Sequence, residues 1–283
     1  MLQGPLPIPL PSIQLFDVSN NKLNGEVSHL FCNMSSLYEF KLSNNYLSGM
    51  VPHCLGNSST SLSWLSLGNN SFHGVIPQIC SNGGSASSLR WIDLSHKFHG
   101  QLPRSWSNCM MVEGIVVSNN QLVDTFPSWL GSLAELKLIV LHHNGFYGVI
   151  EKLKMDVNQF SKLHVIDLSS NNFTGVFPSQ FIASWNAMKS IESNGLKHMG
   201  AEWNASLSKK YYISHSDVYK MTVTSKGVDT YDQVIQDIFA FVDLSDNIFE
   251  GEISDLFGKL KALRSLNLST TCSSEAFHHL WEI

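Results

Sequence analysis

The stretch that decides the fold is Leu62–Pro77, which reads LSWLSLGNNSFHGVIP. Its spacing is L-x-x-L-x-L-x-x-N-x-F-x-G-x-I-P. The leucines lie on one side of a short extended segment, and Trp64 and Ser66 point to the other side. Because one such unit is too small to bury its own apolar side, the spacing predicts one coil in a stack of similar coils.

The same spacing returns along nearly the whole chain. The second apolar residue of each L-x-L stands at Val18, Leu42, Leu67, Leu94, Val117, Leu141, Leu168, Leu244 and Leu268. All steps but one fall within the roughly 20–29 residues of a leucine-rich repeat. We therefore predict an α/β repeat solenoid, a right-handed leucine-rich-repeat superhelix with a parallel sheet on its concave side.

The asparagine and the glycine of each unit have predictable structural roles. An interior amide donates and accepts at once, so stacked asparagines can satisfy backbone groups where each strand turns. They stand at Asn21, Asn45, Asn70, Asn120, Asn144, Asn171 and Asn247. The glycine four residues later predicts a turn with positive φ.

Two coils depart from the pattern. Asp93–Gly100 (DLSHKFHG) is one residue short, with Lys97 nearest the asparagine position, which predicts local strain or different hydrogen bonding. Asp124 stands where glycine is expected, so either an aspartate adopts the left-handed conformation or the turn is reshaped.

Residues 184–234 interrupt the repeats. Their aromatic and β-branched residues predict short strands, and we expect an ordered insertion that folds back onto the solenoid. The predicted division is repeats over 1–183 (about seven coils), the insertion over 184–234, repeats again over 235–269 and a tail without the pattern over 270–283.

Charge and cysteine spacing argue against several kinds of site. A net charge of -5 without long charge runs does not suggest a nucleic-acid partner. No two cysteines show Cys-x-x-Cys spacing, so no metal site is predicted. The sequence has five cysteines: Cys32, Cys54, Cys80, Cys109 and Cys272. The favoured interpretation is that they are small buried residues on the convex side, and the alternative is disulfides between adjacent coils.

Signals for export are mixed. The start, MLQGPLPIPLPS, has no basic region and is interrupted by prolines, so it is not a signal peptide, and no apolar run is long enough to span a bilayer. Six glycosylation triplets nevertheless favour a secreted history: Asn33, Asn57, Asn69, Asn172, Asn204 and Asn267. A chain of the secreted type without an export signal suggests an incomplete gene product.

The insertion carries the most specific motif. Residues 219–227 read Y-x-x-x-V-T-x-K-G, and repeats resume soon afterwards. With the repeat consensus, this resembles the plant leucine-rich-repeat receptor-like proteins, a cell-surface family that includes disease-resistance receptors, over about residues 2–269. In that family a similar segment closes an "island" insertion. The resemblance implies a fragment of an ectodomain on the extracellular side of the plasma membrane.

The outward residues of the strands are expected to form the recognition surface. Trp64 and Trp91 fall in one column on adjacent coils beside charged residues, as in binding hot spots. The alternative is that the two rings pack on each other or on a neighbouring glycan. The predicted ligand-binding set on the concave face is Glu39, Lys41, Trp64, Trp91, Asp93 and His142.

The island offers a second candidate surface, with Trp203, Tyr211, Tyr212 and Tyr219. By resemblance, islands help to hold or shape the ligand site. The alternative is a structural patch over the coil junction at residues 176–181.

No enzymatic signature accompanies the repeats. His142 and His143 point to opposite faces, and the sequence has no nucleophile elbow, phosphate loop, kinase signature or HExxH. We therefore expect a protein that is not an enzyme and uses no cofactor.

By resemblance, the chain would recognise a peptide, protein or glycan ligand in defence or developmental signalling, with a receptor kinase as co-receptor. Three alternatives are the ectodomain of a receptor kinase, a secreted inhibitor of microbial cell-wall hydrolases and a pseudogene product. Residues 184–234 argue against the inhibitor, since such inhibitors are shorter solenoids without an island.

Overall fold

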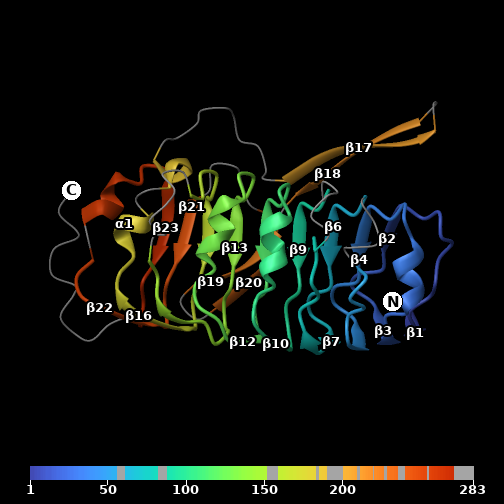
Figure 1. Cartoon of the computed structure of the whole chain (residues 1–283), viewed down its shortest axis with the longest axis horizontal. Coiled ribbons are helices and arrows are strands. Elements are labelled where there is room, and N and C mark those ends of the chain that lie inside the picture. Colours follow the sequence, from blue (N-terminus) through green and yellow to red (C-terminus); the bar gives the residue numbers. More distant parts are fainter. Residues whose placement is uncertain are drawn as a thin grey trace.

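The computed structural model describes residues 1–55, 61–81, 88–151, 159–182, 185–189, 200–208, 211–218, 220–225, 228–234, 240–253 and 255–270. Successive coils stack side by side into an elongated solenoid (Figure 1). The leucine-rich-repeat solenoid predicted from the sequence is confirmed.

The main sheet has nine parallel strands, and each coil contributes one. Consecutive strands pair in register along the solenoid, so equivalent residues of successive coils form straight columns. The strands are, in order, β2 (Leu15–Asp17), β4 (Glu39–Lys41), β6 (Trp64–Ser66), β9 (Trp91–Asp93), β11 (Gly114–Val116), β13 (Leu138–Val140), β15 (Val165–Asp167), β21 (Ala240–Asp243) and β23 (Leu263–Asn267).

A second layer of parallel strands follows the main-sheet strands along the coils. It is divided into three sheets. These are β1 (Gln3–Pro5), β3 (Lys22–Glu26), β5 (Tyr46–Gly49) and β7 (Ser71–Phe72); then β8 (Gly74–Val75), β10 (Phe98–Gly100) and β12 (Gln121–Leu122); then β14 (Tyr147–Val149), β16 (Asn172–Val176) and β22 (Ile248–Glu250).

The first break in this layer lies next to one irregular coil, between β7 and β8, and the second lies within the other. The first break precedes the short coil, where His96 and Lys97 both have positive φ (81° and 67°). The second break is at Asp124, which does not have positive φ, so the turn is reshaped there. Its carboxylate accepts from the Thr125 N–H at 2.8 Å, and only an isolated bridge joins Thr125 to Tyr147.

The chain returns along the convex side in short helical turns. Pro103, Pro127 and Pro178 directly precede three of them, where a fixed φ suits the start of a turn. The turns are η1 (His29–Asn33), η2 (Arg104–Asn108), η3 (Ser128–Ser132), α1 (Ser179–Ile182), η4 (Asn186–Met188) and η5 (Asp255–Lys259). None of these described helices could span a bilayer.

The core runs along the inside of the coils. Phe146, Phe173 and Phe249 stack in sequence, with ring centroids 6.2 and 6.3 Å apart. Such offset aromatic pairs stabilise packing beyond the apolar area they bury. Each coil therefore holds the next one by its interior side chains.

The predicted asparagine ladder is present. Asn70 Nδ2 donates to the carbonyl of Leu67 at 3.1 Å and to that of Leu42, in the preceding coil, at 2.9 Å. Its Oδ1 accepts from the Leu47 N–H at 3.0 Å. Asn120, Asn144, Asn171 and Asn247 repeat the arrangement. Lys97 interrupts it, since an ammonium group has no acceptor.

Four strands lie within the predicted insertion and form two antiparallel hairpins. The first pairs β17 (Gly200–Ser208) with β18 (Tyr211–Val218), and the second pairs β19 (Lys220–Ser225) with β20 (Val228–Val234). In Figure 1 the β17–β18 hairpin extends beyond the coils, and β19 and β20 overlap the middle coils in projection.

Candidate functional site: the outer face of the main sheet

The outer face of the main sheet carries two columns of side chains. The first column aligns Glu39, Trp64, Trp91, Gly114 and the equivalent residues of later coils. The second aligns Lys41, Ser66, Asp93, Val116 and their equivalents. The register therefore brings Glu39, Lys41, Trp64, Trp91 and Asp93 together on three adjacent strands.

The prediction that Trp64 and Trp91 are exposed is wrong. They retain only 8% and 4% exposure and stack on each other, with ring centroids 5.1 Å apart. Lys41 Nζ lies 4.6 Å from the centroid of the Trp64 ring and covers its other side. The two rings pack on each other, as the alternative states.

Glu39 is also closed to solvent. Its exposure is 3%, and its carboxylate pairs with Lys41 Nζ at 2.7 Å. It can therefore hold the ammonium group over the Trp64 ring, and it is not available as a surface contact. Lys41 and Asp93 are half-buried and keep part of their surface accessible.

The two tryptophans belong to a second apolar cluster, separate from the core inside the coils. Its buried members are Trp64, Trp91, Leu138, Val140, Val165 and Phe241. These side chains point away from the interior, yet Leu138 and Val165 have no exposed surface. The first column of the outer face is thus closed to solvent along β6–β21, whereas Ser66, Asp93 and Val116 of the second column are half-buried.

Asp93 lies at the edge of this cluster in a network of hydroxyl groups. Ser66 Oγ donates to its carboxylate at 3.0 Å and Ser95 Oγ at 2.9 Å. Burial raises the pKa of Asp93, and the hydrogen bonds from the two serines oppose that shift.

A second polar network, which the sequence prediction missed, joins His142 through Ser169 to the buried carboxylate of Asp167, beside Asp243. His142 Nδ1 lies 2.7 Å from Ser169 Oγ, which donates to Asp167 Oδ1 at 2.5 Å. Asp167 pairs in register with Asp243, so the carboxylates are neighbours on adjacent strands. Burial, followed by the negative charge of Asp243, raises the pKa of Asp167 to about 7.

The signal for this pair is present in the sequence, because Asp-Leu-Ser occurs on consecutive coils at Asp167 and Asp243. His142 follows β13, two strands along the sheet from β9, so it does not join the tryptophan group.

The island residues can be placed only in part. Trp203 lies in β17, and Tyr211 and Tyr212 lie in β18. The side chains of these three residues, and Tyr219 altogether, lie outside the described part of the chain. Their role stays a prediction.

The glycosylation triplets differ in access. Asn33, Asn69 and Asn172 are exposed. Asn267 is half-buried, and its Nδ2, the atom that would carry a glycan, donates to Asp243 Oδ2 at 2.9 Å. Asn57 and the side chain of Asn204 lie outside the described residues.

Of the four described cysteines, Cys80 and Cys109 are buried, as the favoured interpretation expects, but all four are paired in disulfides, as the alternative states. Cys32 is bonded to Cys54 and Cys80 to Cys109, with Cα atoms 5.5 and 5.6 Å apart, and each bond joins adjacent coils. Cys272 lies outside the described residues. Disulfides of this kind persist in oxidising compartments, which agrees with a secreted type of chain.

Comparison with known proteins agrees with this architecture. The Leucine Rich Repeat family model matches residues 12–34, 36–58, 61–82 and 162–183. Receptor-like proteins 32 and 19 of Arabidopsis thaliana are 36% and 37% identical over 89% of the chain, covering 27% and 25% of their own lengths. This chain thus spans about a quarter of the length of those relatives.

Among solved structures, that of the plant peptide hormone receptor RGFR1 in complex with RGF2 matches with a TM-score of 0.69 and 25% identity. The match covers 96% of this chain and 35% of that one. The chain therefore belongs to the leucine-rich-repeat family, and its curated relatives are receptor-like proteins of plants.

Proposed function

We propose that this chain is the ligand-recognising part of a plant cell-surface receptor-like protein, that it binds a peptide, and that it is not an enzyme. Its curated relatives are receptor-like proteins, and the similar solved structure is a peptide hormone receptor in complex with RGF2. The adjacent-coil disulfides support a location on the extracellular side of the plasma membrane. A receptor kinase acting as co-receptor completes the proposal, in defence or developmental signalling.

The observation that carries the proposal is the line of half-buried polar groups beside the covered apolar cluster. Lys41, Ser66, Asp93 and His142 keep partial access, whereas Trp64 and Trp91 are closed. Groups of both charge signs spaced along one face suit an extended peptide, whose backbone and side chains need several polar contacts in a row.

The apolar cluster has a different role in this proposal. We infer that the island folds over it, because 184–234 is the long segment outside the coils and because Leu138 and Val165 are closed to solvent although they lie outside the coil interior. The island would then be fixed by Trp91, Leu138 and Phe241, and its own aromatic residues would form the second wall of the peptide site.

A selection from a random peptide library displayed on phage tests the proposal. Peptides enriched on the immobilised wild-type chain should bind the Lys41→Gln, Asp93→Asn and His142→Gln variants at least several-fold more weakly. Met110→Ala is the matched control, because Met110 is 55% exposed and lies beyond η2, away from the main sheet. Equal binding by all four folded variants would contradict the proposed site.

The co-receptor step has a separate readout. A selected peptide added to plant cells that express the complete receptor should increase co-purification of a receptor kinase. An unchanged yield of kinase would reject the co-receptor step and leave peptide recognition standing.

A further inference from the structure

Three side chains with metal-binding atoms meet on the convex side of the first two coils. His29 and Cys32 are three residues apart in η1, and in a 3₁₀ helix side chains at that spacing lie above one another. Ser28 begins the helix by accepting a hydrogen bond from the Leu30 N–H at 3.2 Å. The stacking of the coils then brings Cys54 against this face.

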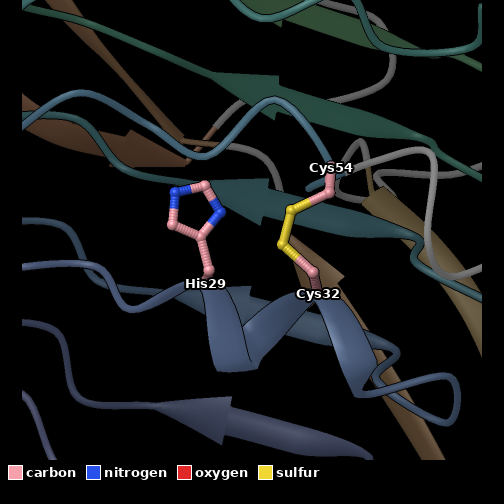
Figure 2. Close-up of side chains that lie close together, drawn as sticks. All are labelled: His29, Cys32 and Cys54. Carbon is pink, nitrogen blue, oxygen red and sulfur yellow. A yellow bond between two sulfur atoms is a disulfide. The ribbon is translucent and has the colours of Figure 1, made fainter.

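The resulting cluster is compact. One ring nitrogen of His29 and the sulfurs of Cys32 and Cys54 all lie within 4.8 Å of one another. Figure 2 shows the imidazole and the disulfide side by side, with His29 and Cys32 rising from η1 and Cys54 coming from the neighbouring coil. His29 is exposed and both cysteines are half-buried, so an ion and a reductant can reach the group from solvent.

We propose that His29, Cys32 and Cys54 form a binding site for a zinc-like divalent cation when the disulfide between the two cysteines is reduced. Thiolate and imidazole are the preferred ligands of such an ion. With Zn–S bonds of about 2.3 Å and Zn–N bonds of about 2.0–2.1 Å, a tetrahedral ion separates two sulfurs by about 3.8 Å and sulfur from nitrogen by about 3.6 Å. The Cα atoms of the two cysteines, 5.5 Å apart, allow this by side-chain rotation.

The chemistry balances in two steps. A dithiol reductant supplies two electrons and two protons, becomes a disulfide itself, and converts the Cys32–Cys54 bond into two thiols. A phosphine reaches the same two thiols with water, because phosphorus gives two electrons and takes the oxygen of the water, whose two protons go to the sulfurs. The divalent cation then displaces one proton from each thiol and accepts the lone pair of a neutral imidazole nitrogen. Three protein ligands leave one position for water. The disulfide and the metal therefore exclude each other.

The other disulfide provides an internal comparison. Cys109 is fully buried and Cys80 is 8% exposed, so that pair is shielded from solvent. In the part of the chain that the structure describes, only the His29 group brings three such ligands together. Cys-x-x-Cys spacing could not reveal it, because the ligands come from two coils. The signal in the sequence is His29-x-x-Cys32.

Titration of the full chain with Co²⁺ after mild reduction by a phosphine tests the site, in a Cys272→Ser background that removes the fifth thiol. We expect one equivalent of Co²⁺ to give thiolate charge-transfer and tetrahedral absorption bands, which Zn²⁺ then abolishes. The oxidised chain should give neither band. His29→Gln should weaken binding by roughly tenfold or more, because loss of a ligand costs at least as much as loss of an outer-shell partner.

A second readout identifies the ligands without relying on a variant that fails to fold. Zn²⁺ should slow alkylation of Cys32 and Cys54, measured for each cysteine by mass spectrometry, and leave alkylation of Cys80 and Cys109 unchanged. His143→Gln is the matched control for His29→Gln, because His143 is also exposed and lies far along the chain from η1. Absence of protection at Cys32 and Cys54, or equal affinity in the His29→Gln variant, would overturn the proposal.

Discussion

The indole of Trp91 lies over Gly114, its register partner in the next strand of the main sheet. A β-carbon at residue 114 would overlap Cε3 and Cζ3 of the Trp91 ring. The backbone of Gly114 does not need positive φ, so the glycine is required by space alone. It allows Trp91 to lie flat on the sheet beside Trp64, which accounts for the burial of both rings.

Gly114→Ala should therefore destabilise the chain by about 1–3 kcal/mol, since the methyl group forces the indole out of its packed position. Urea unfolding followed by circular dichroism measures this. Gly258→Ala is the control, because a β-carbon there meets no atom within 4 Å. If the two substitutions lower the free energy of unfolding equally, the close approach of Trp91 to Gly114 is contradicted.

Trp64→Ala and Trp91→Ala should each lower the free energy of unfolding by about 3 kcal/mol, the usual cost of emptying a buried aromatic site. The control is Tyr46→Ala, since Tyr46 is 63% exposed and its removal should cost about 0.5 kcal/mol or less. If the loss of stability is no larger than that of the control, the two tryptophans are exposed, as the sequence alone suggested.

The repeat pattern predicts the contacts between adjacent coils. The strand register, the asparagine ladder and the interior packing all follow from the spacing of the consensus residues. The same pattern cannot predict the burial of Trp64 and Trp91, since that burial depends on Lys41 and Gly114, which stand at positions that the repeat consensus leaves open. Disulfide pairing likewise depends on how the stacking of the coils places the convex segment of one coil against that of the next. His29 and Cys54 are separated in sequence and meet only through that stacking.

A column of left-handed residues also escaped prediction. The residue before each ladder asparagine has positive φ, as at Asn20, Asn44 and Asn69 (57°, 59° and 52°). Asparagine tolerates this conformation better than most residues, which explains the paired asparagines of the early coils. Later coils have His143, Ser170 and Asp246 at this position, so the type of residue there does not by itself predict the left-handed turn.

Neighbouring asparagines should respond very differently to truncation. Asn171 Nδ2 donates to the carbonyls of Leu141 and Leu168 at 3.0 and 3.1 Å, and its Oδ1 accepts from the Phe146 N–H at 3.0 Å. Asn171→Ala leaves these buried backbone groups without partners and should cost about 2–4 kcal/mol. Asn172→Ala, at an exposed position, should cost about 0.5 kcal/mol or less in unglycosylated chain. Equal melting temperatures for the two variants would contradict the ladder.

The Asp167–Asp243 pair should make stability depend on pH. The pKa of Asp167 is raised to about 7 in the folded chain from an ordinary value of 3.8, so between these values the folded state binds more protons than the unfolded state. The free energy of unfolding should then decrease as pH rises from about 4 to 7, by a few kcal/mol at most. Acidification toward pH 5 stabilises this part of the solenoid.

Asp167→Asn should raise stability at pH 7.5 and flatten the pH dependence, because the amide keeps an acceptor for the Ser169 N–H and Oγ and carries no charge. Asp17→Asn is the matched control: Asp17 occupies the same column of the first strand, accepts from the Ser19 N–H at 2.9 Å and is exposed. Chemical unfolding at pH 5, 6, 7 and 8 compares the three chains. A wild-type chain whose stability rises with pH over this range, or an Asp167→Asn variant that follows the wild-type curve, would contradict the raised pKa of Asp167.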